Sequence, residues 1–409
     1  MTPPDSASPA AAPPEKRWTR RGTWDYRRIN LALVLSGWAT FAGLYATQPL
    51  LPELAEEYSV SAAESSLALS LSTASLAIAI MVAGALAETI GRKTLMFGSL
   101  ILAALFGIAA AMAPNWHLLL VFRALEGAAL GGAPAVAMAY LAEEIEPAGL
   151  GTAMGLLIGG NAFGGMSGRV VTGFVTEHFG WRPALATVGV LGLLAAIGFA
   201  ALLPPSRNFT PKPARGLAPH FAAWGRHLAE PALRRLYLIS FLTMGGFVTA
   251  YNYIGFRLTA APYALGQDAV GAIFVVYLAG IVASPMAGNA ADRIGRAPVL
   301  IGGLAIAVTG LVTTLAAPLW AIVVGVALLT FGFFAAHTAA SGWIGRIARQ
   351  NQSHAAALYL LAYYLGSSIA GSSGGVVWHW GGWPAVVGYV GVLYAGAMAA
   401  GVSVARRMR

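Results

Sequence analysis

Two ionisable residues of opposite charge, Arg123 and Glu126, lie three positions apart in the apolar stretch 117 to 140. In a helix this spacing places both side chains on one face. A charged side chain inside a membrane is costly unless it is paired or hydrated. We therefore expect the two residues to pair or to face a cavity. They could handle a proton, or form a structural ion pair that only positions the helix.

Two further ionisable residues lie inside apolar stretches. Arg169, near the end of the stretch 150 to 174, could bind an anionic substrate, or could extend its guanidinium to the membrane interface, which is the interpretation we favour. His337, in the stretch 319 to 341, could take up a proton near neutral pH. A lone histidine is more often a hydrogen-bonded packing residue, so both roles remain open.

The composition indicates a membrane protein. Hydrophobic residues make up 57% of the 409 positions and charged residues 10%, which excludes a soluble domain of this length. The chain has no cysteine, so disulfides, thiol catalysis and Cys-based metal sites are excluded. We find no phosphate-binding Gly-Lys loop and no His and carboxylate cluster at metal-ligand spacing. We therefore expect neither an enzyme nor an ATP-driven pump, and no metal or cofactor.

Apolar segments of about 20 residues, each long enough to cross roughly 30 Å of hydrocarbon, give the domain organisation. We predict an all-α polytopic protein with twelve transmembrane helices, at 29 to 51, 65 to 87, 94 to 113, 117 to 140, 150 to 174, 183 to 203, 234 to 256, 269 to 290, 297 to 316, 319 to 341, 354 to 377 and 383 to 404. The expected parts are a disordered arm (1 to 28), a six-helix bundle (29 to 203), a linker (204 to 233), a second six-helix bundle (234 to 404) and a tail (405 to 409).

The distribution of basic residues predicts the orientation. If the N-terminus is cytoplasmic, 21 of the 25 Lys and Arg residues fall in the arm, the linker region, the tail and the loops on the cytoplasmic side. The positive-inside rule therefore places both termini and the linker in the cytoplasm. The formal charge of +9 follows from this topology. It favours contact with anionic lipid headgroups and gives no separate indication of nucleic-acid binding.

A short polar motif occurs twice, between successive apolar segments. The copies are GALAETIGRK at 84 to 93 and GNAADRIGRA at 288 to 297, 204 residues apart. The matched positions are Gly84 with Gly288, Glu88 with Asp292, Gly91 with Gly295 and Arg92 with Arg296. Glycine allows helices to approach closely, and an acid can accept from the free amides of a helix N-terminus. We expect these turns to join helices and to hold one conformational state.

This pair of motifs resembles the loop between the second and third helices, and its repeat, in the Major Facilitator Superfamily of transporters. The second copy has Asp292 and Arg293 of the family pattern, whereas the first has Glu88 and Thr89. The resemblance implies two pseudo-symmetric six-helix halves, with the substrate site between them near the midplane. It also implies a conformational gating role for both copies of the motif.

Two other stretches resemble motifs of the same family. Arg123-Ala-Leu-Glu126-Gly127 is similar to its Arg-x-x-Gln-Gly motif, associated with proton coupling, with Glu in place of Gln. The window with Gly160, Asn161, Gly164 and Gly165 resembles the antiporter motif Gly-Pro-x-x-Gly-Gly, with Asn161 at the proline position. Close packing through small residues would explain the same glycines without any antiport function.

The resemblance also implies which helices surround the substrate. The first, seventh and eleventh segments would line the central cavity, and they contribute polar candidates in addition to Arg169 and His337. These candidates are Tyr45, Gln48, Tyr251, Asn252, Tyr359 and Tyr363. Any one of the tyrosines could instead be an interface or packing residue.

An acidic stretch after the fourth segment departs from the positive-inside pattern. It contains Glu143, Glu144 and Glu146 and no Lys or Arg. Pseudo-symmetry places the second motif copy beside the start of the fifth helix. We therefore expect these acids to pair with Arg293 and Arg296 and to close the cytoplasmic side as a latch.

The predicted function is secondary transport. The resemblance indicates a monomeric transporter of the drug:proton antiporter-like branch, of the bacterial arabinose-efflux-permease type, in the inner membrane. It would export a small molecule in exchange for protons. A proton symporter that imports a sugar or organic anion remains open because of Asn161. An alternative of another class is a non-transporting receptor or a lipid scramblase.

Overall fold

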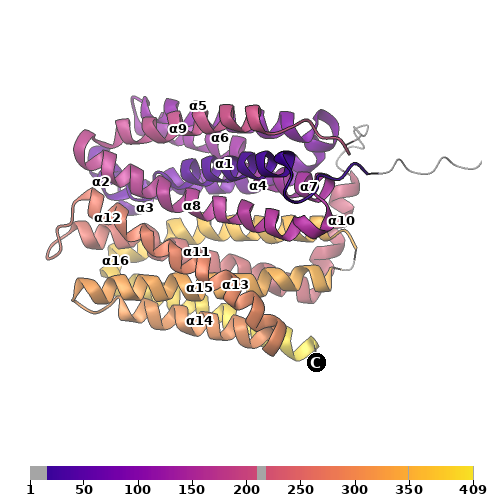
Figure 1. The fold of residues 1–409 in the computed structure, drawn as a ribbon. Coiled ribbons are helices and arrows are strands. Elements are labelled where there is room, and N and C mark those ends of the chain that lie inside the picture. Colours follow the sequence, from indigo (N-terminus) through magenta and orange to yellow (C-terminus); the bar gives the residue numbers. More distant parts are fainter. Residues whose placement is uncertain (1–15, 210–217, 349, 409) are drawn as a thin grey trace, which may run out of the picture.

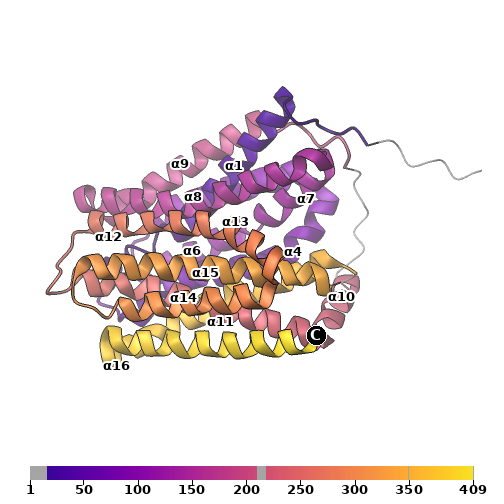
Figure 2. The ribbon, with the colours of Figure 1, turned by 60° about the horizontal axis from the view of Figure 1, so that its bottom comes forward.

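The computed structural model describes residues 16 to 209, 218 to 348 and 350 to 408, and almost all of them are helical. The helices form two bundles that lie side by side (Figure 1), one from the first half of the chain and one from the second. Figure 2 shows the same arrangement after a turn of 60°. The predicted all-α fold with twelve spans in two halves is confirmed.

The first half contains six spans, two of which are divided into shorter helices. Its elements are α1 (Trp24–Tyr45), α2 (Leu51–Glu57), α3 (Ala62–Ser65), α4 (Leu67–Ile90), α5 (Arg92–Ala111), α6 (Trp116–Leu130), α7 (Pro134–Glu144), α8 (Pro147–Phe179) and α9 (Trp181–Leu202). The second span combines α3 and α4, and the fourth combines α6 and α7. The break between α6 and α7 falls at Gly131 to Ala133, just before Pro134, which lacks an amide hydrogen to continue the helix.

The second half also contains six spans. Its elements are α11 (Pro231–Thr259), α12 (Gln267–Ile273), η1 (Phe274–Val276), α13 (Tyr277–Ile294), α14 (Arg296–Thr313), α15 (Leu319–Ile347) and α16 (Gln352–Met408). The eighth span combines α12, η1 and α13. The last two spans form α16, which is broken by non-helical backbone at Gly381 and Gly382. By length and apolar composition alone, seven helices of the described chain could each cross a membrane.

Three boundaries differ from the sequence prediction. Helix α1 begins at Trp24, and residues 16 to 23 are not a free arm, because the Thr19 amide donates to Glu144 O at 2.8 Å. The linker contains a helix of its own, α10 (Ala218–Ala229). Helix α16 continues to Met408, through most of the expected tail. Residues 1 to 15 of the arm lie outside the described residues.

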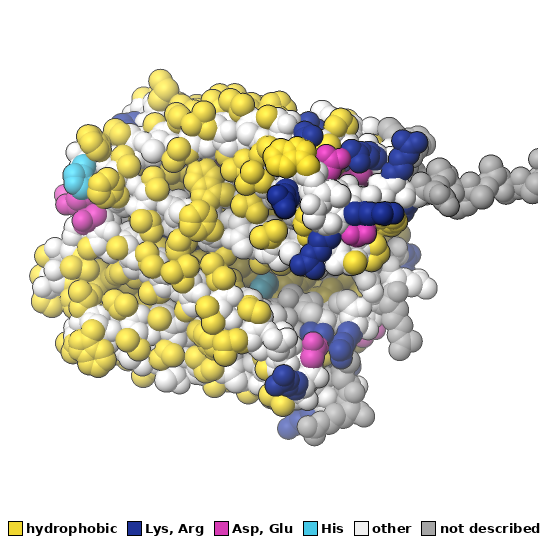
Figure 3. All heavy atoms as spheres, in the orientation of Figure 1, with side chains coloured by type: hydrophobic (Ala, Val, Ile, Leu, Met, Phe, Trp, Pro, Cys, Tyr) yellow, Lys and Arg dark blue, Asp and Glu magenta, His cyan; other side chains and the backbone are white. Residues whose placement is uncertain are grey.

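The molecule has two different ends. We call the end that carries both described termini, the 91 and 295 turns and α10 the basic end, because Lys and Arg gather there (Figure 3). We call the opposite end the far end, where the 46 to 61 segment, which includes α2, and the 260 to 266 loop lie. Gly91 and Gly295 form the sharp turns of the basic end, with φ of +93° and +90°, a backbone region that disfavours residues with a Cβ.

The two halves are joined at the far end. Hydrogen bonds cross between them from Gln48 Nε2 to Asn252 Oδ1 (2.7 Å) and from Ser372 Oγ to Ser70 Oγ (2.7 Å). A third crosses from the Gln267 amide to Glu177 Oε2 at 2.6 Å. These contacts close the far end.

At the basic end the halves are separated by a cavity. It has a volume of about 440 Å³ and is lined by α4, α5 and α7 of the first half and by α10 and α16. Figure 3 shows a recess between the halves that opens toward this end. The structure is therefore one in which the space between the halves is open at the basic end and closed at the far end.

The seam between α1 and α8 gives a stability prediction. A Cβ on Gly164 would lie 2.6 Å from the Trp38 Cα, whereas a Cβ on Gly159 would meet nothing within 4 Å. We expect Gly164→Leu to lower the free energy of unfolding by about 1 to 3 kcal/mol, the usual cost of overpacking. Thermal unfolding in detergent measures the effect, with Gly159→Leu as the matched control. Equal stability of the two variants would contradict this packing.

Candidate functional site

Arg123 and Glu126 of α6 are both buried and form an ion pair. The guanidinium also donates to Ala68 O of α4 (2.9 Å) and to Gly43 O (3.2 Å) and Leu44 O (2.8 Å) of α1. A buried charge needs such partners, because desolvation of an unpaired ion is very costly. Arg123 therefore joins α6 both to the end of α1 and to the start of α4.

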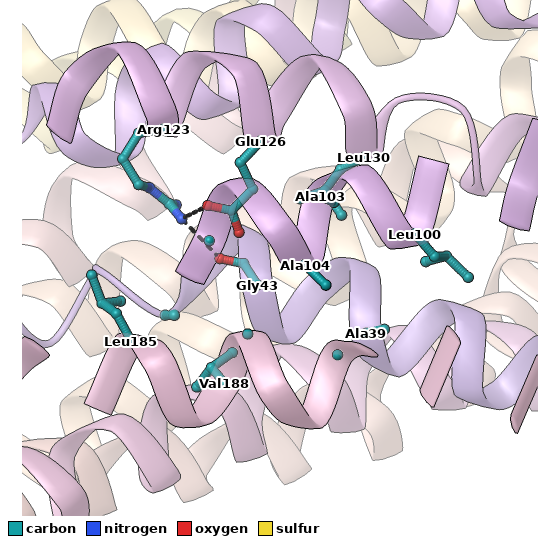
Figure 4. A pocket seen from close by; sticks show the side chains of 14 residues that line it. Ala39, Gly43, Leu100, Ala103, Ala104, Arg123, Glu126, Leu130, Leu185 and Val188 are labelled. Carbon is teal, nitrogen blue, oxygen red and sulfur yellow. Dashed lines mark hydrogen bonds and ion pairs between the residues drawn. The ribbon is translucent and has the colours of Figure 1, made fainter. Parts of the chain in front are cut away.

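Glu126 faces a small cavity inside the first bundle (Figure 4). The cavity has a volume of about 20 Å³, room for one water molecule, between α1, α5, α6 and α9. Its other lining residues besides Arg123 are apolar or glycine. A Cβ on Gly43 or Gly107 would lie 3.0 or 3.3 Å from Glu126 Oε1, so these glycines make room for the carboxylate. The pair therefore lies away from the recess between the halves.

The end of α1 connects this pair to the seam between the halves. Gly43 and Leu44, which accept from Arg123, directly precede Tyr45. The Tyr45 ring centroid lies 4.1 Å from the Arg169 Cζ. The end of α1 therefore contacts Arg123 through its backbone and Arg169 through the Tyr45 ring.

Arg169 of α8 is fully buried, so its predicted extension to the membrane interface is wrong. The guanidinium donates to Gln48 Oε1 (2.7 Å), to Gly165 O (2.6 Å) and, across the seam, to Tyr277 OH (3.2 Å). Sequence alone could not distinguish these outcomes, because α8 runs deep into the seam and its far end is covered by α12.

The structure brings four of the cavity candidates into one polar group. Arg169, Gln48, Asn252 and Tyr45 are connected by hydrogen bonds and ring contacts, and Asn252 lies on the opposite half from the others. Tyr251 is bonded to Thr330 Oγ1 at 2.6 Å within the second half. Its ring lies 5.2 Å from that of Tyr277, which connects it to the same group.

The remaining candidates, His337, Tyr359 and Tyr363, form a second group. His337 Nδ1 and Tyr359 OH lie 3.1 Å apart, and the His337 and Tyr363 ring centroids are 4.9 Å apart. His337 and Tyr363 are only partly buried. His337 is thus hydrogen-bonded, as the packing interpretation expects, and is also partly exposed.

Sequence reasoning missed the aromatic residues that join the two groups. Phe247 stacks on Phe333 at a centroid distance of 3.9 Å and meets Tyr277 at 5.7 Å. Phe333 in turn lies 5.9 Å from the His337 ring. Aromatic residues inside apolar segments have no distinguishing pattern, so only the fold could reveal this cluster.

The predicted pairs between the acidic stretch and the second motif copy are not formed in this state, which is open at the basic end. Glu143 makes a bidentate pair with Arg92 of its own half, at 2.6 and 3.0 Å. Glu144 accepts from the amides of residues 207 and 208, and Glu146 accepts from the Arg21 amide at 2.6 Å. These acids are used within the first half because the cavity at the basic end separates them from the second.

The other motif residues make fewer contacts than expected. A Cβ on Gly84 or Gly288 would meet nothing within 4 Å, so neither glycine marks a close helix contact in this state. Glu88 lines the cavity at the basic end, and Asp292 and Arg293 are exposed. The Arg296 Nε is buried without a hydrogen-bond partner.

The antiporter-like window forms the contact between α8 and α1. A Cβ on Gly160 would lie 2.9 Å from Val34 O, and one on Gly165 would lie 3.3 Å from Arg169 Nη1. Asn161 lies beside Gly37 of α1, and α8 is unbroken there. In the described part of the chain no group of three His, Asp or Glu residues could hold a metal ion.

Comparison with known proteins decides the family. A model described as the Major Facilitator Superfamily matches residues 33 to 260 and 247 to 408. The chain belongs to the Major Facilitator Superfamily.

Two full-length relatives agree with this assignment. The chain is 42% identical over 373 residues to the Uncharacterized MFS-type transporter YybF of Bacillus subtilis (strain 168), covering 91% of this chain and 92% of that one. It is also 42% identical over 392 residues to the Inner membrane transport protein YnfM of Escherichia coli (strain K12), covering 96% and 94%. Members of this family are transporters and not enzymes, so this chain is a multi-pass transporter of the plasma membrane.

Solved structures show the same fold at low sequence identity. The nucleoside transporter NupG matches with a TM-score of 0.73 at 14% identity, over 91% of this chain and 99% of that one. A bacterial homolog to the human lysosomal transporter Spinster, in an inward-facing and unoccupied conformation, matches with a TM-score of 0.70 at 16% identity, over 93% and 95%. Both matches support the arrangement of two six-helix halves.

Proposed function

We propose that this Major Facilitator Superfamily transporter exports a small molecule in exchange for protons, by alternating access of one site between its halves. The observation that carries the proposal is the contrast between the ends. Hydrogen bonds join the halves at the far end, and a cavity of about 440 Å³ separates them at the basic end. This is one of the two states that alternating access requires, and the glycine turns with Arg92 and Arg296 would act in the change to the other.

We assign the coupling proton to Glu126. It is a buried carboxylate near the middle of the fourth span, whereas Glu144, which is also buried, ends that span and accepts from the amides of residues 207 and 208. Arg123 is the one other charged residue that lines the Glu126 cavity in the described chain. Protonation would cancel the attraction to Arg123 and free the end of α1 to move. In an exchanger, the protein changes state only when either the substrate or the proton is bound. The two ligands therefore cross the membrane in opposite directions.

The antiporter-like motif on α8 is what favours export in this proposal. The basic end would face the cytoplasm under the positive-inside rule, so in the present state the site would open to the inside of the cell. The glycine window on α8 packs against the helix that Arg123 holds, which places the antiporter-like motif next to the coupling path.

A transport assay tests the proposed function. The purified protein is reconstituted in proteoliposomes, and uptake of a panel of labelled anions, neutral compounds and cations is measured with and without an imposed pH gradient. If the protein exchanges substrate for protons, one class of compound should accumulate inside the proteoliposomes, and only when the imposed gradient lets protons leave. Accumulation with the opposite gradient would indicate a symporter. Absence of transport across the panel, with binding or lipid mixing retained, would support a receptor or a scramblase.

The orientation gives a separate prediction. Because the chain has no cysteine, single Ala12→Cys and His220→Cys variants can be labelled specifically. We expect an impermeant maleimide to label neither variant on intact cells and both after permeabilisation. Asp268→Cys, exposed at the far end, is the positive control on intact cells. Labelling of position 12 or 220 without permeabilisation would contradict the predicted topology.

A further inference from the structure

The Arg169 guanidinium is a buried cation without an acidic partner. In the described chain no carboxylate lies within ion-pairing distance of it. Its hydrogen-bond partners, an amide oxygen, a backbone carbonyl and a tyrosine hydroxyl, are all neutral. Arg123, the other fully buried arginine of the first bundle, has Glu126. The seam between the halves therefore carries one uncompensated positive charge.

Two N–H groups of this buried guanidinium have no hydrogen-bond partner in the described chain. An arginine has five N–H groups, and the contacts above use three: the one on Nε and one on each Nη. The two that remain are on Nη1 and Nη2, the pair that a carboxylate can engage with both of its oxygens. The rings of Tyr45, Tyr277 and Phe274 lie 4.1 to 4.9 Å from Cζ and provide cation–π contacts.

The orientation of the neighbouring amides also follows from Arg169. Arginine can only donate, so Gln48 must turn its oxygen toward Nε and its Nε2 toward Asn252. Asn252 then presents its oxygen to Gln48, and its Nδ2 is left buried without a hydrogen-bond acceptor. This donor without a partner lies on the opposite half of the protein, and the Gln48 side chain connects its amide to the guanidinium.

The side chains that follow Arg169 into the second half are aromatic, and most of them are buried. Tyr277, Phe247, Phe333 and Phe334 contact one another with centroid distances of 3.9 to 6.2 Å. The cluster continues to His337 and Tyr363, which are only partly buried. Aromatic rings prefer stacked or edge-to-face contacts with other rings.

We infer that the substrate is a small aromatic monocarboxylate, whose carboxylate binds Arg169 and whose ring packs among the aromatic residues of the second half. A single guanidinium without other cations compensates one negative charge, which favours a monoanion. The inference rests on the proposed function for the site between the halves. It adds the substrate class to that site.

Binding of three matched compounds to the full-length protein in detergent, measured by calorimetry, tests the inference independently of proton coupling. Benzoate, benzamide and benzylamine share one ring and differ in charge. We expect benzoate to bind about tenfold or more tightly than benzamide, since hydrogen bonds to charged groups are the stronger ones. Benzylamine, a cation at neutral pH, should not bind.

Variants locate the interaction. Arg169→Gln should weaken benzoate binding about tenfold or more and bring it close to that of benzamide, while Arg169→Lys should keep part of the preference for the anion. Arg182→Gln is the control. Arg182 lies at the far end and donates to Ala111 O and Ala113 O, so this variant should bind benzoate as the parent does. Equal affinity for benzoate and benzamide, no binding of any of the three, or unchanged benzoate affinity in a folded Arg169→Gln protein would each overturn the inference. A transporter that fails this test could still couple transport to protons.

Discussion

Arg123→Ala is expected to abolish proton-driven transport and to lower the free energy of unfolding by about 3 to 5 kcal/mol, the cost of breaking a buried ion pair from one side. The variant leaves Glu126 buried without its partner. It also removes the hydrogen bonds that join α6 to α1 and α4. Thermal unfolding in detergent and uptake in proteoliposomes measure the two effects.

A double variant separates the two causes. Arg123→Ala with Glu126→Ala removes both charges, so most of the lost stability should return, while coupling to protons should remain absent. Wild-type stability and transport in the single Arg123→Ala variant would show that the pair neither supports α1 nor takes part in the transport cycle.

Gly375→Leu is expected to prevent closure of the far end. Gly375 of α16 meets α3 of the other half, where an added Cβ would lie 2.6 Å from the Ala63 amide nitrogen and 2.7 Å from its Cβ. These are backbone and Cβ atoms, which cannot move aside by changing rotamer. A larger side chain should therefore push the halves apart at this end and favour the state that is open there.

Distances between spin labels measure this change. Labels at Glu57 and Leu319, exposed at the far ends of the two halves, should move apart in the variant, and transport should be lost. Gly388→Leu is the matched control, because a Cβ at Gly388 on the same helix would meet nothing within 4 Å. An unchanged distance distribution in folded Gly375→Leu would contradict the assignment of this contact to the closed far end.

Features that repeat along the chain could be predicted from sequence, because each depends on local composition. The twelve spans follow from the length of the apolar segments, and the turns at Gly91 and Gly295 follow from the repeated motif. The pairing of Arg123 with Glu126 follows from their helical spacing. None of these inferences requires knowledge of how the helices pack.

Contacts between distant segments could not be predicted in the same way. Several arginines of the chain could pair with Glu143, and only the packing of α5 against α7 makes Arg92 its partner. Arg169 has a side chain long enough to reach the lipid interface or the seam, and the covering α12 decides between them. The aromatic cluster joins α11, α13 and α15, which are far apart in the sequence.

We propose that protonation of Glu126 couples proton movement to transport, and the Glu126→Gln variant is the direct test. Glutamine has nearly the shape of a protonated glutamate and cannot ionise, so the variant should fold and bind substrate as the parent does. The measurement is proton flux, recorded by a pH-sensitive dye inside proteoliposomes, together with uptake of the compound that the panel assay identifies.

We predict that Glu126→Gln moves substrate down its own gradient without proton flux and without a response to an imposed pH gradient. Proton flux and pH-gradient dependence equal to those of the parent would contradict the account and would assign the coupling proton to another residue, such as His337, Glu88 or Asp292.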